Sequence, residues 1–270
     1  MEGATKGYHL ITRINNFDLS YDDLGEGEVP IIFLHGFPFS KSMWRAQLEF
    51  LKTAYRVIAY DIRGFGNSKD EESVLSIDLF GDDLIRFMDK LAIEKAIVCG
   101  LSMGGYIALN ACKRYAGRFK GLILCDTQCI ADTPESKAKR YKLIDEIALN
   151  GTGNFTEGFL KNVFHKDSLT EKKEIVEDIR TVILSNSQHI ITMGLRALAE
   201  RTESCSFLGE IDIPALIICG REDLVTPLAQ SEFMNHNIKG SILRIIDNAG
   251  HVSNLEQADE FNNHLLEFLK

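Results

Sequence analysis

Short apolar segments of strand length alternate with segments of helical periodicity along most of this chain. Six of them, mostly apolar and four or five residues long, lie at 31–34, 57–60, 96–99, 121–125, 215–219 and 242–246. Runs of this kind are typical of strands that are covered on both faces. Two further candidate strands, 10–14 and 17–21, precede them as a β-meander. This alternation predicts an α/β fold built on a doubly wound, mainly parallel sheet.

One stretch, residues 132–206, interrupts the alternation. Helical patterning recurs there at 141–149, 155–163, 171–185 and 190–200, and no strand pattern stands out. A chain of 270 residues suits one large domain with an inserted subdomain. We therefore predict a core domain of residues 1–131 and 207–270, and a helical cap (lid) insertion of residues 132–206 over one edge of the sheet.

The charged residues argue against nucleic-acid or membrane partners. The net charge is −9, and no long run of one sign occurs, so the chain lacks the basic footprint of a nucleic-acid or anionic-lipid binder. The first residues show no secretory h-region, and the longest apolar runs fall far short of the ~20 residues of a membrane helix. We expect a cytoplasmic protein with a small-molecule substrate, no nucleic-acid partner and no membrane partner.

The six cysteines show neither a C-x-x-C pair nor a His/Cys cluster with zinc spacing. Cys99, Cys125 and Cys219 lie inside predicted strands, where a thiol behaves as a small apolar side chain. We predict free thiols in a reducing compartment, no disulfide framework and no metal site.

The pentapeptide Gly100-Leu101-Ser102-Met103-Gly104 stands between the strand at 96–99 and a helix predicted over 106–115. The G-x-S-x-G pattern alone also describes a glycine-rich turn with a capping serine. With an apolar strand before it and an amphipathic helix after it, the pattern is typical of a nucleophile elbow. Glycines leave room for the strained turn that exposes the hydroxyl at the positive end of the following helix. We predict Ser102 as a nucleophile.

A serine hydroxyl is a weak nucleophile and needs a nearby base. Of the seven histidines, His35 and His251 each follow a predicted strand. His251 follows the last strand, at the carboxyl edge where ligands bind in open α/β sheets. We predict His251 as the base and His35 as a residue that braces its loop.

Asp223 follows the strand at 215–219 and completes the chain order Ser…Asp…His. Its predicted role is to accept the imidazole N–H and to hold the tautomer of His251. Asp126, at the end of the strand at 121–125, is the second candidate for this acid, and Glu222 is the third.

Two backbone amides can be named as an oxyanion hole. One is the N–H of Met103, directly after Ser102, and the other is the N–H of Phe37, in the turn after the strand at 31–34. Pro38 has no N–H and cannot donate.

Together these segments resemble the α/β-hydrolase family, and within it the small carboxylesterase and 3-oxoadipate enol-lactonase-like group. The resemblance lies in the oxyanion segment 34–40 with Met43-Trp44, the D-x-R-G-x-G-x-S loop at 61–68, the elbow at 101–105, the acid segment 214–227 and the histidine segment 248–256. It implies that the 61–68 loop is structural.

The resemblance implies cofactor-free hydrolysis of a small carboxylic ester or lactone through an acyl-enzyme. Dehalogenase and epoxide-hydrolase relatives carry an aspartate at the elbow, and Ser102 disfavours both. Three alternatives stay open: a carbon–carbon bond hydrolase, a perhydrolase and a lactone receptor with little turnover. The segment Phe37-Pro38-Phe39 lowers the first, because such hydrolases usually carry Gly-Pro-Gly there.

A substrate pocket is expected beside these groups and under the insertion. Its predicted lining residues are Phe39, Trp44, Leu195 and Leu198, and Phe155 and Phe159 are further candidates.

Overall fold

The computed structural model describes residues 6–270, and within them eight strands form one sheet. The order across the sheet is β1-β2-β4-β3-β5-β6-β7-β8. The strands are β1 Gly7–Ile14, β2 Phe17–Leu24, β3 Ile31–Leu34, β4 Val57–Tyr60, β5 Ala96–Leu101, β6 Phe119–Cys125, β7 Ala215–Gly220 and β8 Ile242–Ile246.

The sheet is parallel from β4 to β8, while β1 and β2 pair antiparallel with each other and β2 pairs antiparallel with β4. The carboxyl ends of β3, β5, β6, β7 and β8 therefore meet at one edge, where the loops of the candidate site emerge. The predicted fold class, a doubly wound and mainly parallel sheet, is confirmed.

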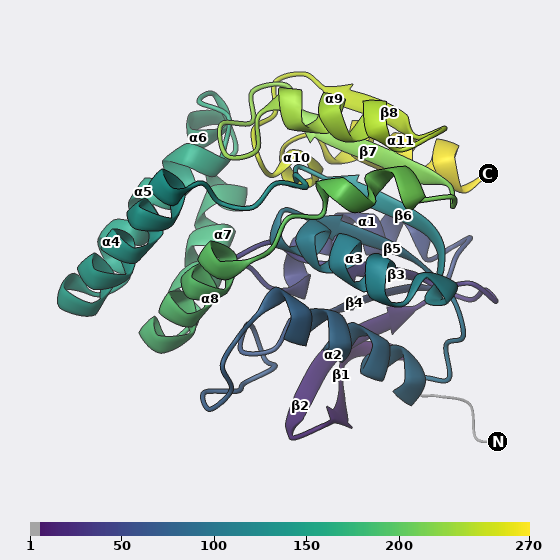
Figure 1. Cartoon of the computed structure of the whole chain (residues 1–270), viewed down its shortest axis with the longest axis horizontal. Coiled ribbons are helices and arrows are strands. Elements are labelled where there is room, and N and C mark those ends of the chain that lie inside the picture. Colours follow the sequence, from purple (N-terminus) through teal and green to yellow (C-terminus); the bar gives the residue numbers. More distant parts are fainter. Residues whose placement is uncertain (1–5) are drawn as a thin grey trace.

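Helices cover both faces of the sheet (Figure 1). The core helices are α1 Arg45–Leu51, α2 Ile77–Lys90, α3 Met103–Arg114, α9 Leu228–Asn237, α10 Ser253–Glu256 and α11 Ala258–Leu269, with 3-10 turns at Lys41–Trp44, Ala116–Arg118 and Cys205–Glu210. α2 and α3 pack together on one face. α1 lies behind the sheet against α11, where the Gln47 amide donates to Asn262 Oδ1 at 3.0 Å.

Two helix predictions need correction. The apolar spacing at 255–269 predicts one closing amphipathic helix, but the structure divides it at Gln257 into α10 and α11. Helix α9 was not predicted, since only Ser231 and Met234 of its side chains are buried and it shows no continuous apolar stripe.

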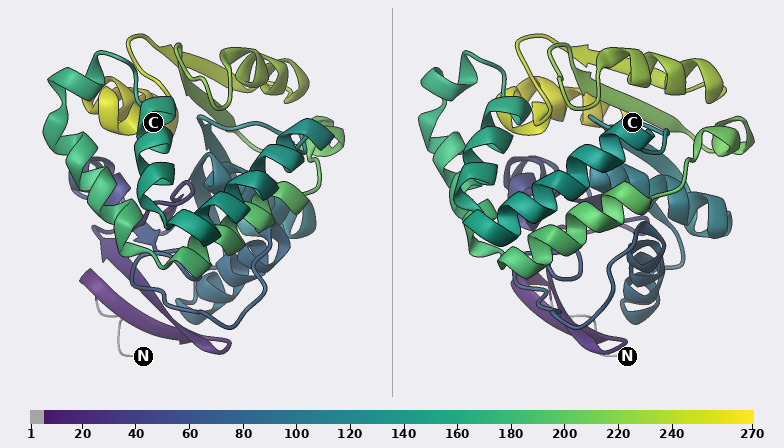
Figure 2. Two further views of the ribbon diagram at one scale, coloured as in Figure 1. Left: turned by 90° about the vertical axis from the view of Figure 1, so that its left-hand side faces the viewer. Right: turned by 60° about the vertical axis from the view of Figure 1, so that its left-hand side comes forward.

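Five helices and no strand occupy the chain between β6 and β7, within the predicted insertion. They are α4 Pro134–Asn150, α5 Gly153–Val163, α6 Ser168–Glu171, α7 Lys173–Ser185 and α8 Gln188–Glu200. They form a separate layer at one side of the molecule, with α4 alongside α8 and α5 against α7 (Figures 1 and 2).

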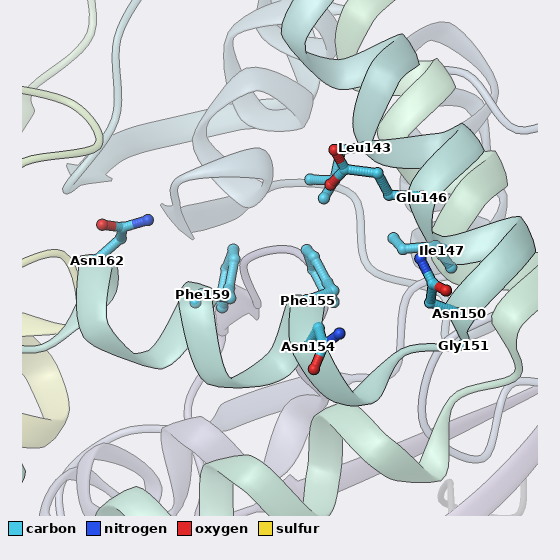
Figure 3. Close-up of a pocket in the computed structure, with 10 residues that line it drawn as sticks. Leu143, Glu146, Ile147, Asn150, Gly151, Asn154, Phe155, Phe159 and Asn162 are labelled. Atoms are coloured by element: carbon cyan, nitrogen blue, oxygen red, sulfur yellow. The ribbon is translucent and has the colours of Figure 1, made fainter.

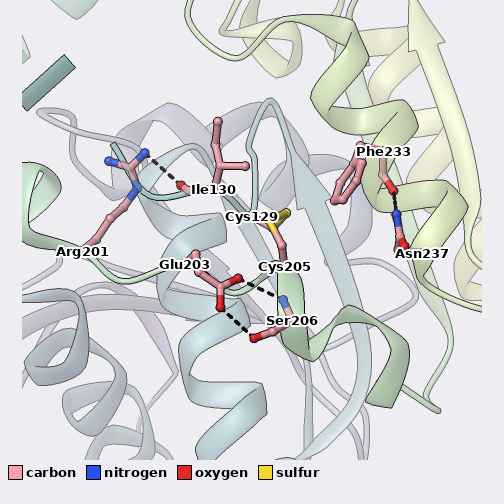
Figure 4. Close-up of a disulfide and its surroundings, with 8 residues drawn as sticks. All are labelled: Cys129, Ile130, Arg201, Glu203, Cys205, Ser206, Phe233 and Asn237. Atoms are coloured by element: carbon pink, nitrogen blue, oxygen red, sulfur yellow. Dashed lines mark hydrogen bonds between the residues drawn. A yellow bond between two sulfur atoms is a disulfide. The ribbon is translucent and has the colours of Figure 1, made fainter. Parts of the chain in front are cut away.

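A disulfide joins Cys129 to Cys205, the residues that flank the five helices (Figure 4). Their Cα atoms are 4.9 Å apart, although their sequence separation is 76. The prediction of free thiols is therefore wrong for these two cysteines. It rested on local spacing, and a pair assembled by the fold leaves no local signature. The other four cysteines are free and buried.

Arg201 forms a second link between the segments that enter and leave the five helices. Its guanidinium donates to Asp132 Oδ1 at 2.6 Å. It also donates to the Ile130 carbonyl at 3.1 Å (Figure 4). The entry and exit of the helical layer are thus joined by a covalent bond and by a buried ion pair.

The 61–68 loop is held by a buried ion network centred on Arg63. Its guanidinium donates to both carboxylate oxygens of Asp83 at 2.6 Å and to Asp70 at 2.7 Å. Such a network fixes a loop, because removing one partner would leave a buried charge uncompensated.

No helix within residues 6–270 has the length and apolarity needed to cross a membrane.

Candidate active site

The nucleophile elbow is tighter than the sequence predicted. Strand β5 continues to Leu101 and α3 begins at Met103, so Ser102 alone makes the turn. Its backbone lies at φ 53° and ψ −114°, a region that a non-glycine residue occupies only under strain. A Cβ atom at Gly100 would lie 2.2 Å from the Gly104 carbonyl oxygen, and one at Gly104 would lie 2.2 Å from that of Leu34. The close approach of the backbones therefore requires both glycines.

The structure brings the three predicted side chains together. His251 Nε2 lies 2.8 Å from Ser102 Oγ, and His251 Nδ1 lies 2.8 Å from Asp223 Oδ2. All three residues are buried, with Ser102 the most exposed at 8%. An imidazole between a carboxylate and a hydroxyl can take the hydroxyl proton as the oxygen attacks an electrophile.

Thr226, which sequence reasoning missed, fixes the Asp223 carboxylate. Its hydroxyl donates to Asp223 Oδ2 at 2.7 Å, and its backbone N–H and that of Val225 donate to Oδ1 at 3.0 and 2.7 Å. Both carboxylate oxygens are thus held in place beside the imidazole. A threonine three residues after a candidate acid is the only sequence signal for this contact.

The buried charges shift the pKa values of the pair in opposite directions. Burial by itself would lower the pKa of His251, but the Asp223 carboxylate, helped by Asp126 and Glu256, raises it above its ordinary value. Burial would raise the pKa of Asp223, but the charge and hydrogen bond of His251 and the hydrogen bonds of Thr226 lower it. Asp223 is therefore ionised over the range in which His251 titrates.

The backbone N–H groups of Phe37 and Met103 donate to no acceptor among residues 6–270, which leaves both free for a ligand oxygen. Phe37 lies in the turn after β3, before a cis peptide bond to Pro38. His35 braces this turn: its Nε2 accepts from the Ile62 N–H at 2.9 Å, and its Nδ1 donates to the Gly36 carbonyl at 2.8 Å. Burial lowers the pKa of His35 to about 4, so its ring is neutral.

The predicted pocket residues divide into two groups. The ring of Phe39 lies 5.9 Å from that of Phe159 on α5, next to the candidate site. Trp44 instead packs between Phe33 and Phe261, with ring centroids 5.0 and 6.1 Å away. These contacts place Trp44 in the core under α11, and its predicted pocket role is not supported.

Leu195 and Leu198 are buried on α8. They follow Gly194, where a Cβ atom would lie 2.6 Å from the ring of Phe37. Helix α8 therefore packs closely on the side chain whose own amide is a candidate oxyanion donor.

A cavity of about 430 Å³ opens between α4 and α5 (Figure 3). Its lining residues are Leu143, Glu146, Ile147, Asn150, Gly151, Asn154, Phe155, Gly158, Phe159 and Asn162. Figure 3 shows the rings of Phe155 and Phe159 projecting from α5 into this space. The same rings lie 6.3 Å from the ring of Phe37, so the cavity shares an aromatic wall with the oxyanion turn. The residues from α4 were missed, because their facing position depends on helix packing.

The end of α5 is bonded directly to the loop of His251. The His251 N–H donates to the Val163 carbonyl at 2.7 Å. Glu256 spans the same junction, since its two carboxylate oxygens accept from the His165 N–H and the Gly250 N–H, each at 2.7 Å. The helical layer and the histidine loop are therefore one connected unit.

Comparison with known proteins agrees with this architecture and with the motifs. Residues 29–258 match the model of the alpha/beta hydrolase fold family. The chain is 32% identical over 251 residues to a 3-oxoadipate enol-lactonase of Acinetobacter baylyi, covering 90% of each chain. Among solved structures, a thermophilic esterase from Thermogutta terrifontis superposes with a TM-score of 0.90 at 33% identity, covering 94% of this chain and 93% of that one. An enol-lactonase from Burkholderia xenovorans also gives 0.90, at 27% identity, covering 96% and 99%. The chain therefore belongs to the α/β-hydrolase family, among the sequences that resemble its 3-oxoadipate enol-lactonases.

Proposed function

We propose that this protein is a serine hydrolase that cleaves a small carboxylic ester or lactone through an acyl-enzyme. The observation that carries the proposal is the unbroken chain of contacts from Asp223 through His251 to Ser102, with 2.8 Å at each step. The likeness to proteins named as enol-lactonases and as an esterase supports the same class of substrate.

In the proposed mechanism, His251 Nε2 takes the proton of Ser102 Oγ as that oxygen attacks the ester carbonyl. The amides of Phe37 and Met103 stabilise the oxyanion that forms. Asp223 holds the ring and stabilises the imidazolium, which then protonates the leaving alcohol. For a lactone, this alcohol stays attached to the acyl group. A water molecule, deprotonated by His251, releases the acid and restores Ser102.

We assign the roof of the site to the helical insertion, residues 132–206, and a part of the substrate to the cavity between α4 and α5. Phe155 and Phe159 support this assignment, because their rings contact both the cavity and Phe37. The proposed steps use only side chains and amides of this chain and no cofactor. The sequence also predicts a small-molecule substrate, no nucleic-acid or membrane partner, and a cytoplasmic location, and these stay predictions.

A panel of p-nitrophenyl esters of increasing acyl length and of small lactones tests the function. Steady-state turnover of members of either set supports it, and a fluorophosphonate adduct on Ser102 identifies the nucleophile. Three results would contradict it in favour of an alternative. A single-turnover burst followed by ligand-induced destabilisation indicates a receptor. Hydrolysis of a carbon–carbon bond in a diketone formed by opening of an aromatic ring, without esterase activity, indicates a carbon–carbon hydrolase. Peracid formation from acetate and hydrogen peroxide, without ester turnover, indicates a perhydrolase.

The pH dependence of hydrolysis follows from the raised pKa of His251. Only the neutral imidazole can take the serine proton, so kcat/KM rises with pH as His251 loses its proton. Since Asp223 raises this pKa, we expect the acid limb above the value of 6.5 of an ordinary histidine. Measuring kcat/KM for one p-nitrophenyl ester from about pH 5 to 9 checks this. An acid limb below 6.5 would show that burial outweighs the carboxylate.

A further inference from the structure

Asp126, which does not touch His251 Nδ1 or Ser102, is placed at the centre of the site's supporting loops. It follows β6 directly and is fully buried. Its backbone lies at φ 43°, in the left-handed region that non-glycine residues seldom occupy. A buried carboxylate on a strained backbone is costly, and such positions collect at functional sites.

The two oxygens of Asp126 bond to two different loops. Oδ1 accepts from the Gly220 N–H at 2.8 Å, at the end of β7 and three residues before Asp223. Oδ2 accepts from the Ser253 hydroxyl at 2.6 Å and from its N–H at 3.3 Å, two residues after His251. The carboxylate thus joins the loop of the candidate acid to the loop of the candidate base.

We propose that Asp126 is a positioning residue for His251, which holds the Asp223 and His251 loops together and sets a second negative charge beside the imidazole. This inference rests on the proposed function, because the base it positions is the base of that mechanism. The structure gives Asp223 the direct contact with His251, so Asp126 acts alongside the acid and does not replace it.

The charges around Asp126 determine how it acts on His251. Asp223 and His251 face it from the loops after β7 and β8, and the thiols of Cys125 and Cys219 lie on its own and the neighbouring strand. The charge of Glu256 also raises the pKa of His251. Burial and the charge of Asp223 raise the pKa of Asp126 to about 7. Ionised Asp126 in turn raises the pKa of His251.

Two variants separate the charge from the tether. Asp126→Asn removes the charge but keeps the shape: its oxygen can still accept from Gly220, and its NH2 can donate to the Ser253 hydroxyl, so that only the longer 3.3 Å bond from the Ser253 N–H is lost. Ser253→Ala removes one hydrogen bond to the loop of His251 and keeps the carboxylate. Asp126→Ala removes both and is expected to lower kcat by about 10²-fold through misplacement of the ring.

The experiment measures kcat, KM and the pH profile of ester hydrolysis, together with the pKa of His251 from NMR of histidine-labelled protein. For Asp126→Asn we expect the acid limb and the imidazole pKa to move to lower pH, with KM and melting temperature near wild type. For Ser253→Ala we expect kcat to fall, with a smaller movement of the imidazole pKa than in Asp126→Asn, because the carboxylate stays but loses the hydrogen bond that favours its ionised form.

An unchanged imidazole pKa in Asp126→Asn would overturn the inference, as would a loss of melting temperature in all three variants with kcat and pH profile intact. The NMR titration needs no substrate. A shifted imidazole pKa in a protein that hydrolyses no ester would therefore refute the proposed function and keep the role of Asp126. Normal ester hydrolysis with an unshifted imidazole pKa in Asp126→Asn would keep the proposed function and refute the role of Asp126.

Discussion

Replacing Ser102 with alanine is expected to lower kcat for ester hydrolysis by about 10⁶-fold, as loss of the nucleophile does in other triad enzymes. The fold should survive, because the elbow is held by its backbone. The Ser102 N–H donates to the Cys125 carbonyl at 2.9 Å, and the Ser102 carbonyl accepts from the Thr127 hydroxyl at 2.8 Å. Turnover of a p-nitrophenyl ester and the melting temperature, measured on both proteins, check the two statements.

Ser185→Ala is the matched control, since Ser185 is an exposed serine at the end of α7 whose hydroxyl donates to the Val182 carbonyl of the same helix. It should leave turnover unchanged and keep labelling by a fluorophosphonate, while Ser102→Ala should lose both. A Ser102→Ala protein with wild-type turnover would remove Ser102 from the mechanism.

Breaking the Cys129–Cys205 disulfide is expected to lower the free energy of unfolding by about 4 kcal/mol on the chain-entropy account. The bond closes a loop across 76 residues of sequence separation, so its loss frees the unfolded chain around the whole helical insertion. For a chain of this size the melting temperature should fall by about 10 °C. Thermal unfolding of the Cys129→Ser, Cys205→Ser double variant measures the change.

A reducing agent provides the control for this experiment. It should lower the melting temperature of the wild-type protein toward that of the double variant and leave the double variant itself unchanged. Equal melting temperatures for the oxidised wild type and the double variant would contradict the prediction. They would indicate that the ion pair between Arg201 and Asp132, at 2.6 Å, holds the two ends of the insertion together without the disulfide.

The buried parallel strands were the part of the fold most readable in the sequence. The predicted bounds of β3 and β4 match the structure, because a strand covered on both faces is a short continuous apolar run between turns. Those of the edge strand β8 match as well, although it is only partly buried. The elbow was predicted too wide, since a single strained residue can turn the chain where propensity suggests several. Helix α9 was missed for want of an apolar stripe.

The candidate site was readable only where residue type and chain order carry the signal. Ser102, Asp223 and His251 fall at strand ends in a recognisable order, and the structure brings them together. Thr226 bonds to a single carboxylate, and its place three residues after the acid is a weak signal. Glu256 acts by bonding to backbone groups, and such contacts leave no residue pattern. The Cys129–Cys205 pair was missed for the same reason, since only the fold brings its two halves together.

The hydrogen bond from His251 to Val163 has a consequence for how ligand preference can change in this protein. Helix α5 presents Phe155 and Phe159 to the cavity and ends on the residue that holds the imidazole loop. A substitution that tilts α5 to suit a new ligand also displaces the proton acceptor, so selectivity and rate change together. The opposite wall, from Leu143 to Ile147 on α4, can be reshaped with less effect on proton transfer, which makes α4 the freer place for adaptation.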